Sequence, residues 1–452
     1  MSRWRLVIGL LSVGLLWPIS TLATNGYFSH GYGAKNKGLA GGGIALPQDA
    51  MIAATNPAGM VFVGDRMEAG ISLFSPMRSY NASTPASTFP DGTSCGSSCP
   101  FTVGGEDGNQ AINSENEQFL IPHFAYNHPL DNQSTVGITV YGNGGMNTEY
   151  QGGEAQYNNG AGTLTTSDGT FGAGTAGVNL EQLFINASFA HKLSENSSWG
   201  IGAIYAFQRF EAKGLGTFQG YSVAPTKLTD NGEDDSSGFG FKFGFQAEAA
   251  PGITLAASYQ TKIDMDEFDK YSGLFADGGD FDIPATLTIG AAWASSDQSV
   301  FTFDVQQIYY SDVPSIANPI SNLTTGCATG SDTTQCLGGA NGAGFGWQDM
   351  TIYKLGYQWN SSPDWQWRLG FSTGDQPIPS SEVMFNILAP AVMEEHITFG
   401  FTHNMSQTSE LNFSAMYAPK ASISGANPLN PGQNIELEMS QYELEASWGW
   451  KF

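Results

Sequence analysis

Histidine and clustered acidic side chains are the groups that could do chemistry in this chain. The acidic clusters at residues 230–235 and 264–269 miss the glycine-containing pattern of an EF-hand loop and are typical of solvated loops. No nucleophile and acid stand at the spacing of a hydrolase around any of the six histidines, His30, His123, His128, His191, His396 and His403. We therefore expect no enzyme, no cofactor and no metal site.

The four cysteines form two close pairs, Cys95 with Cys99 and Cys327 with Cys336, inside stretches rich in Gly, Ser and Thr. In an exported protein such pairs indicate local disulfides that staple loops. Metal binding is the rival interpretation, but no histidine lies near either pair. Four cysteines allow three pairings, which stay open at this point.

The two ends of the chain indicate which kind of fold positions these side chains. Tyr442 and Phe452 bound a run with an apolar residue at every second position, which is typical of the last strand of an outer-membrane β-barrel. Arg3 and Arg5 precede an apolar run and a small-residue site ending at Ala23, so residues 1–23 read as a signal peptide. No later segment holds the roughly 18 uninterrupted apolar residues of a spanning helix. Any membrane insertion would therefore use a closed barrel.

Composition agrees with that class. The 452 residues include 57 Gly and are 12% aromatic but only 13% charged. The net charge of −25 argues against nucleic acid as a partner. This negative charge indicates a surface that stays soluble by charge repulsion or, alternatively, one that binds divalent ions beside the phosphates of lipopolysaccharide.

Period-2 alternation and turn signals predict fourteen strands. Their faces fit apolar outside and polar inside, as where Phe239 and Phe241 alternate with Gly240 and Lys242. The predicted strands are residues 66–75, 119–127, 134–144, 181–191, 199–212, 238–249, 253–267, 285–294, 299–310, 351–359, 364–372, 396–404, 409–418 and 440–452.

Short and long connections alternate along the chain, as periplasmic turns and extracellular loops do. This predicts periplasmic termini and places the loops at 76–118, 148–180 and 312–350 outside, with both cysteine pairs. Residues 24–65, glycine-rich and apolar, precede the first strand. We expect them to fold into the lumen as a plug, followed by the barrel at 66–452.

Residues in that plug carry a resemblance to a known family. The run 38–43 (GLAGGG), Asp49-Ala50 and residues 55–60 (TNPAGM) are similar to the FadL/TodX family of outer-membrane hydrophobic-substrate transporters. Residues 353–357 (YKLGY), 367–371 (WRLGF), 377–379 (PIP) and 398–400 (TFG) resemble the closing strands of that family. The resemblance spans nearly the whole mature chain.

The resemblance implies a fourteen-stranded barrel with an N-terminal hatch in a Gram-negative outer membrane, surrounded by lipid and lipopolysaccharide. It implies passive uptake of long-chain fatty acids or hydrocarbons. Ligand would enter an extracellular groove, pass an inner pocket near the hatch and leave sideways through an opening at a kinked third strand. We expect a monomer.

Several residues take roles under this interpretation, each with a plainer alternative. The kink would lie at Gly142, Asn143, Gly144 and Gly145, unless these residues begin the following loop. Asn56, Pro57 and Ala58 would form a turn that latches the hatch against the kink, unless they form an ordinary turn into the first strand.

Ligand contacts would come from apolar groups in unexpected places. An inner pocket would use hatch residues that could equally be plug core: Tyr27, Phe28, Leu39, Ile44 and Leu46. An outer groove would use loop residues that could equally form a small loop core: Leu215, Phe218, Tyr221, Leu274 and Phe275. Arg209 or Lys242 could meet a carboxylate, or could pair with neighbouring acidic residues.

Two other functions remain open from sequence. A surface adhesin or receptor could have the same barrel with a permanently plugged lumen. A general porin is the other alternative, but porins have an open lumen, whereas residues 24–65 predict an apolar plug.

Overall fold

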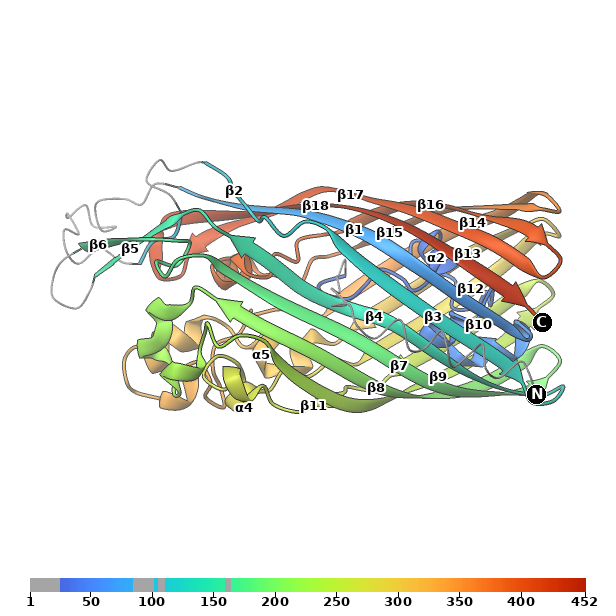
Figure 1. The fold of residues 1–452 in the computed structure, drawn as a ribbon, viewed down its shortest axis with the longest axis horizontal. Helices are drawn as coiled ribbons and strands as arrows, with labels where there is room; N and C mark the ends of the chain where they lie inside the picture. The colour runs from blue at the N-terminus through green and yellow to red at the C-terminus, as the bar shows by residue number, and fades with distance from the viewer. Residues whose placement is uncertain (1–24, 84–100, 105–109, 159–163) are drawn as a thin grey trace.

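The computed structural model describes residues 25–83, 101–104, 110–158 and 164–452. The signal-peptide prediction, Cys95 and Cys99 lie outside them. The chain forms an antiparallel barrel (Figure 1). Its main sheet holds sixteen strands, and fourteen close into a ring because β9 pairs with β10. The ring strands are β1 (Arg66–Ala82), β3 (Phe119–Pro129), β4 (Ser134–Tyr150), β7 (Ala176–Ser194), β8 (Ser197–Lys213), β9 (Asp234–Ala250), β10 (Ile253–Gln260), β12 (Thr286–Ser296), β13 (Ser299–Ile308), β14 (Met350–Ser362), β15 (Trp365–Gly374), β16 (Glu395–Ser406), β17 (Ser409–Asn427) and β18 (Asn430–Lys451).

The predicted fold class and strand number are confirmed. Phe239, Phe241, Phe243 and Phe245 of β9 are exposed on the outer surface, while Lys242 between them is buried. The other sheet members are the short β2 (Ile112–Asn113) and β11 (Asp264–Met265). A separate hairpin joins β5 (Glu154–Asn158) and β6 (Leu164–Asp168).

Several strands run further outward than the alternation predicted. β1 continues to Ala82, β4 to Tyr150 and β17 to Asn427, and β18 begins at Asn430. Residues 419–439, expected as a loop, therefore form a hairpin of two paired strands. In this part of β18 the inward side chains Ile435, Leu437 and Met439 are apolar and alternate with Glu436 and Glu438, so the alternation continues with its faces exchanged.

The prediction of one strand over residues 253–267 is wrong. β10 ends at Gln260, and after a break at residues 261–263 β11 continues along the same neighbouring strand, pairing with Gly238 and Phe239 of β9. The strand breaks because the Thr261 hydroxyl accepts a hydrogen bond from the Phe241 amide (3.1 Å) and Lys262 turns to Asp282.

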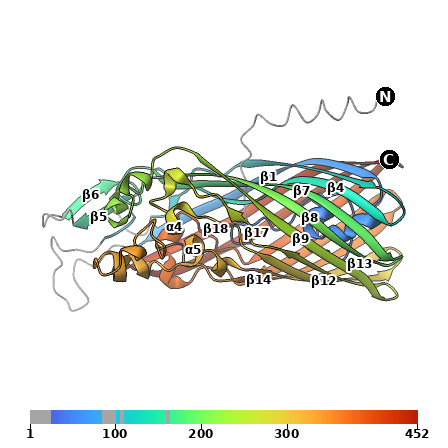
Figure 2. The same ribbon diagram turned by 90° about the horizontal axis from the view of Figure 1, so that it is seen from below.

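The long connections and most helices gather at one end of the barrel, opposite the C-terminus (Figure 2). None of the helices in the described residues is long and apolar enough to cross a membrane. The loop helices are η4 (Gly216–Tyr221), η5 (Pro225–Lys227), η6 (Asp269–Tyr271), α4 (Ala276–Gly279), η7 (Tyr310–Asp312), α5 (Pro314–Ala317), η8 (Leu323–Cys327), η9 (Thr333–Gln335), η10 (Ser380–Glu382) and η11 (Phe385–Ile387).

Residues 25–65, called the N-terminal segment below, lie inside the ring of strands (blue in Figure 1). This segment is made of turns and short helices, namely α2 (Ala34–Lys37), α3 (Ile52–Thr55) and η2 (Pro57–Phe62). Leu39, Ala54 and Ala58 have no exposed surface. Apolar burial is therefore what holds much of this segment against the wall.

Candidate functional site

The barrel wall has a gap between β3 and β4. The two strands pair from Pro129–Thr135 only as far as Phe124–Val140. Beyond that point β1 is the only ring strand that pairs with residues 119–123, and β7 is the only ring strand that pairs with residues 141–150. The gap closes again at its outer end, where the Glu115 amide donates to the Glu149 carbonyl oxygen (2.8 Å).

A β-bulge lies where β4 leaves β3. Gly142 pairs with Leu183 and Gly144 with Gln182, so Asn143 is an extra residue in β4. Such a bulge bends its strand. The predicted kink at Gly142, Asn143, Gly144 and Gly145 therefore lies within a strand, and these residues do not begin the following loop.

The N-terminal segment supplies hydrogen bonds to the bent part of β4. The Ser29 amide donates to the Asn143 carbonyl oxygen and the Gly145 amide to the Tyr27 carbonyl oxygen, each at 2.9 Å. The Asn143 side chain accepts from the Tyr32 hydroxyl (2.8 Å). A Cβ on Gly144 would lie 1.9 Å from the Tyr27 carbonyl oxygen, so only glycine allows this approach.

Asn56, Pro57 and Ala58 form a turn seated elsewhere on the wall. The Asn56 side chain accepts from the Ala58 amide (3.1 Å) and donates to the Ile44 carbonyl oxygen (3.0 Å). Gly200 of β8 and Gly244 of β9 leave room for the turn, since a Cβ on Gly200 would lie 2.5 Å from Pro57. The bent part of β4 is thus bound by Tyr27 and Ser29 rather than by the Asn56 turn.

Buried ion pairs join the N-terminal segment to the last strands. Lys35 contacts Glu410 of β17 (2.5 Å), and Lys37 contacts Glu443 and Glu445 of β18, the latter at 2.6 Å. These side chains are each at most 7% exposed.

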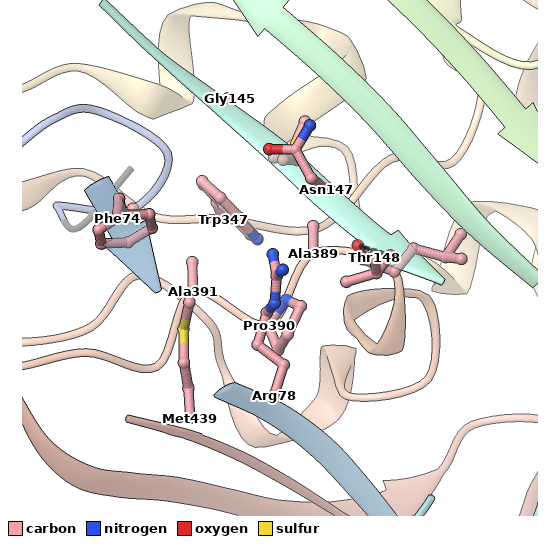
Figure 3. A pocket seen from close by; sticks show the side chains of 13 residues that line it. Phe74, Arg78, Gly145, Asn147, Thr148, Trp347, Ala389, Pro390, Ala391 and Met439 are labelled. Carbon is pink, nitrogen blue, oxygen red and sulfur yellow. Dashed lines mark hydrogen bonds between the residues drawn. The ribbon is translucent and has the colours of Figure 1, made fainter. Parts of the chain in front are cut away.

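An inner cavity lies beside the bent part of β4. Its free volume is about 20 Å³, which is roughly the room that one water molecule needs. Figure 3 shows Arg78 of β1 reaching toward Trp347 and the segment at Ala389. Its walls come from six elements of the barrel and loops and are formed by Gly26, Phe74, Arg78, Gly145, Met146, Asn147, Thr148, Trp347, Leu388, Ala389, Pro390, Ala391 and Met439.

A second pocket, called the outer pocket below, lies among the long loops of the barrel. Four of the five predicted groove residues line it together: Leu215, Phe218, Leu274 and Phe275. The fifth, Tyr221, is 40% exposed and does not line it. Leu388 lines both this pocket and the inner cavity, so the two lie next to each other.

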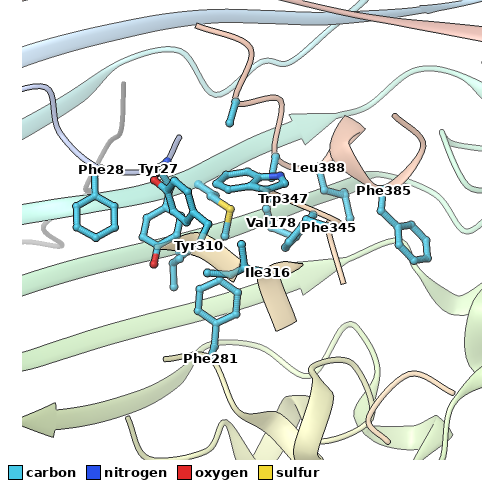
Figure 4. Packing of buried hydrophobic residues seen from close by; sticks show 14 of the residues in the cluster. Tyr27, Phe28, Val178, Phe281, Tyr310, Ile316, Phe345, Trp347, Phe385 and Leu388 are labelled. Carbon is cyan, nitrogen blue, oxygen red and sulfur yellow. Dashed lines mark hydrogen bonds between the residues drawn. The ribbon is translucent and has the colours of Figure 1, made fainter. Parts of the chain in front are cut away.

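The five predicted inner-pocket residues do not line the inner cavity. Tyr27 and Phe28 belong to an aromatic cluster with Tyr310, Trp347 and Phe281 (Figure 4). Leu39 packs against Gly356 of β14, and Ile44 packs with Ala256 and Ala292 of the wall. Leu46 lines a polar cavity at the barrel end where the short turns lie.

Neither predicted cation faces an apolar cavity. Arg209 is 31% exposed and pairs with Asp235 (2.8 Å) and Glu233 (3.4 Å). Lys242 is buried and donates to the Ala54 carbonyl oxygen. Arg78, which does line the inner cavity, was missed because the first strand was predicted to end before Pro76.

Cys327 and Cys336 form a disulfide that joins η8 to the residue after η9. It closes a local loop outside the barrel ring, as predicted. No group of three or more His, Cys, Asp or Glu side chains in the described parts of the chain could hold a metal ion.

Comparison with known proteins gives one family and one fold. Residues 19–442 match the profile of the outer membrane protein transport protein family (OMPP1/FadL/TodX). No curated protein sequence matches the chain. Among solved structures, a FadL homologue of Pseudomonas aeruginosa is 14% identical with a TM-score of 0.66, covering 94% of this chain and 100% of its own.

Two toluene transporters have the same fold. TodX of Pseudomonas putida is 17% identical with a TM-score of 0.62, and the match covers 94% of this chain and 99% of TodX. TbuX of Ralstonia pickettii is 14% identical with a TM-score of 0.56, again over 94% and 99% of the two chains.

Proposed function

Since this chain belongs to the OMPP1/FadL/TodX family of outer membrane transport proteins, we propose that it carries hydrophobic molecules across that membrane by passive diffusion. The molecule enters the outer pocket, passes to the inner cavity under control of the N-terminal hatch, residues 25–65, and leaves through the barrel wall. The family is one of transporters rather than enzymes. Long-chain fatty acids and hydrocarbons are the two candidate substrate classes.

The gap between β3 and β4 carries this proposal. Unpaired backbone is costly at the depth of the bilayer, so a break in the ladder of a membrane barrel needs a function. The inner cavity reaches this break, because Gly145, Met146 and Asn147 of β4 line it. Exit there delivers an apolar molecule to the bilayer, which gains about 0.8 kcal/mol per buried CH₂ relative to water.

The apolar outer pocket supports the entry step. Leu215 and Phe218 from the loop after β8 meet Phe275 from the loop after β11 around one pocket. An apolar molecule in the polar lipopolysaccharide layer would gain by entering it. The inner cavity, which lies next to this pocket, is then the next step of its path.

The hatch controls the last step in this proposal. Tyr27 and Ser29 hold the bent part of β4 by two backbone hydrogen bonds beside the cavity. The Asn56-Pro57-Ala58 turn and the lysine–glutamate pairs keep the rest of the hatch seated. Release of residues 27–29 would free the exit while the remaining hatch stays in place.

Deletion of Asn143 tests the exit. It removes the extra residue of the bulge and lets β4 continue in register with β7. The control is deletion of Lys420, which removes the extra residue of a bulge in β17, away from the gap. Uptake of radiolabelled oleate and of toluene is measured in cells that lack their own transporter.

We expect the intact chain and the Lys420 deletion to raise uptake of at least one solute, and the Asn143 deletion to return it to background. All strains must show folded protein in the outer membrane. Equal uptake by the Asn143 deletion would refute the lateral exit. If the intact, folded chain moves neither solute, transport itself is refuted and a surface receptor takes its place.

A further inference from the structure

A polar cavity much larger than the inner one lies at the barrel end where the short turns are, and it is called the turn cavity below. Its free volume is about 580 Å³, against about 20 Å³ for the inner cavity. A volume of this size falls within the range of small-molecule sites, about 300–1,000 Å³. The turn cavity shares no lining residue with the inner cavity or the outer pocket. The proposed path of hydrophobic molecules therefore gives it no role.

Three cations and one carboxylate line the turn cavity. Lys35 of α2, Arg66 of β1 and Lys451 of β18 contact the carboxylate of Glu410, at 2.5, 3.4 and 2.7 Å. The side chains of Lys35 and Glu410 are at most 5% exposed. Three positive charges against one negative charge leave an excess of two in the lining, although the net charge of the chain is −25.

Other charged groups nearby do not remove this excess. Asp49 and Arg368 lie behind the lining and act on each other, so they add one charge of each sign. The remaining carboxylates around α2 have partners of their own and do not line the cavity, namely Glu68, Glu443 and Glu445. A buried charge is costly unless an opposite charge compensates it. A phosphate monoester, which carries up to about two negative charges near neutral pH, would balance this lining.

Arg66 has donors available for such a group. One of its terminal nitrogens lies 3.4 Å from each of the two carboxylate oxygens of Glu410. Charge-assisted hydrogen bonds of this type are shorter, at about 2.7–2.9 Å. The planar fork of a guanidinium also fits the oxygens of a phosphate. The positions of the three cations around one point therefore favour an oxyanion as the ligand.

The rest of the lining suits hydroxyl groups. Gln358 of β14 is 7% exposed, and its side-chain oxygen has no hydrogen-bond partner among the described residues. This acceptor needs a donor, which a phosphate dianion lacks and a sugar hydroxyl provides. Four more carboxamide side chains line the cavity beside it, those of Gln298, Asn360, Gln366 and Asn404.

We propose that the turn cavity binds a phosphorylated sugar, with the phosphate on Lys35, Arg66 and Lys451 and the hydroxyls on Gln358 and the other carboxamides. Lys35 belongs to the hatch, whereas Arg66 and Lys451 belong to β1 and β18. The bound phosphate therefore joins the hatch to the seam that closes the ring. This inference does not depend on which molecule is transported. The predicted topology places this end of the barrel in the periplasm, from which the ligand would enter.

Equilibrium dialysis with radiolabelled glucose 6-phosphate, inorganic phosphate and glucose tests the proposal. The purified full-length protein in a non-ionic detergent is used at a pH above the second pKa of the phosphate, which is about 6. Lys451→Gln removes one cation, and Gln358→Leu removes the unpaired acceptor. The matched control is Lys420→Gln, because Lys420 also pairs with a glutamate but does not line the cavity. Folding is checked by heat-dependent migration in gels.

We expect the intact protein to bind glucose 6-phosphate about tenfold more tightly than inorganic phosphate, and glucose most weakly. Lys451→Gln should lower the affinity for both phosphates by about tenfold or more, as the loss of a charge-assisted bond does. Gln358→Leu should lower only the affinity for glucose 6-phosphate. Lys420→Gln should bind all three ligands as the intact protein does.

The intact protein alone can overturn the proposal. Absence of glucose 6-phosphate binding at millimolar concentration would show that the turn cavity is not such a site. Equal affinities for glucose 6-phosphate and inorganic phosphate would overturn the sugar as part of the ligand. Unchanged affinities in a folded Lys451→Gln would overturn the placement of the phosphate. Uptake of oleate and toluene is measured separately, so each of these results leaves the transport proposal standing.

Discussion

Asn56 holds two backbone groups of the N-terminal segment with one fully buried amide side chain. In Asn56→Ala the Ala58 amide and the Ile44 carbonyl oxygen lose their partner, at about 1–3 kcal/mol for each buried group. We expect the barrel to fold but the hatch to loosen, seen as more frequent channel openings in planar bilayers. Asn231→Ala, in a loop, is the control, and silent channels in both variants would show that this turn does not hold the hatch.

Asp280, in the loop between β11 and β12, makes that loop sensitive to pH. Burial, and next the Asp282 carboxylate, raise the pKa of Asp280 to about 7. The folded loop then binds more protons than the unfolded one between about pH 4 and 7, so its stability falls as the pH rises through that range. Asp280→Asn removes the charged form and should give most extra protection above pH 7.

Hydrogen exchange of the intact protein and of Asp280→Asn at matched pH values measures this difference. The advantage of the variant should shrink steadily as the pH falls toward 4. A difference that stays constant with pH would show that Asp280 does not titrate in this range.

Arg78 illustrates what the sequence can predict about a single residue and what it cannot. The alternation that predicted β1 continues through Arg78, Tyr80 and Ala82, which are all buried on the inner side. Pro76 was read as the end of the strand, so the inward position of Arg78 was lost. Its cavity could not be predicted, because Trp347 and Leu388 come from loops without a periodic pattern.

Helix α2 is fixed to the wall by charge. Lys37 meets both Glu443 and Glu445 of β18. Lys37→Met would leave Glu443 with His30 and Ser72, and Glu445 with His123, as their remaining partners, so we expect a cost of up to about 3 kcal/mol. We expect a lower unfolding midpoint in urea, followed by Trp fluorescence.

The control for this prediction is Lys420→Met. Lys420 is 62% exposed and pairs with Glu438, a surface pair worth at most about 1 kcal/mol. Equal midpoints for the two variants would contradict a stabilising role for the α2 pairs.

The strands were predicted well where lipid contacts them and poorly above it. Tyr442 and Leu444 of β18 are exposed, so the apolar residues there mark the outer face. Further out, Ile435, Leu437 and Met439 are buried and alternate with glutamates. In the same strand the apolar side chains thus change from the outer to the inner face where lipid gives way to water. A prediction that looks for apolar residues on the outer face therefore ends the strand at that point.

The orientation of the whole barrel can be tested on cells. A peptide tag inserted at Gly330, in the loop closed by the Cys327–Cys336 disulfide, should bind antibody on intact cells. A tag at Gln407, in the turn between β16 and β17, should bind antibody only after the outer membrane is permeabilised. The opposite pattern would invert the topology.

Fold class, strand number and family could be predicted because they rest on patterns repeated along the chain. The contacts of the hatch could not, since they join distant parts of the sequence. The bridge between Phe28 and Gly144, for example, depends on a single bulge and a single glycine. Sequence alone indicated the glycine run but not its partner.

The ion pairs of α2 also bear on the order in which the molecule assembles. Lys35 and Lys37 are made early, yet their partners Glu410 and Glu443 are separated from them by 375 and 406 positions along the chain. Closing such long loops is slow, and the β1–β18 seam that seals the ring uses the same last strand. We therefore expect the ion pairs of the N-terminal segment to form only once the last strand is in place, so that hatch docking and ring closure complete together.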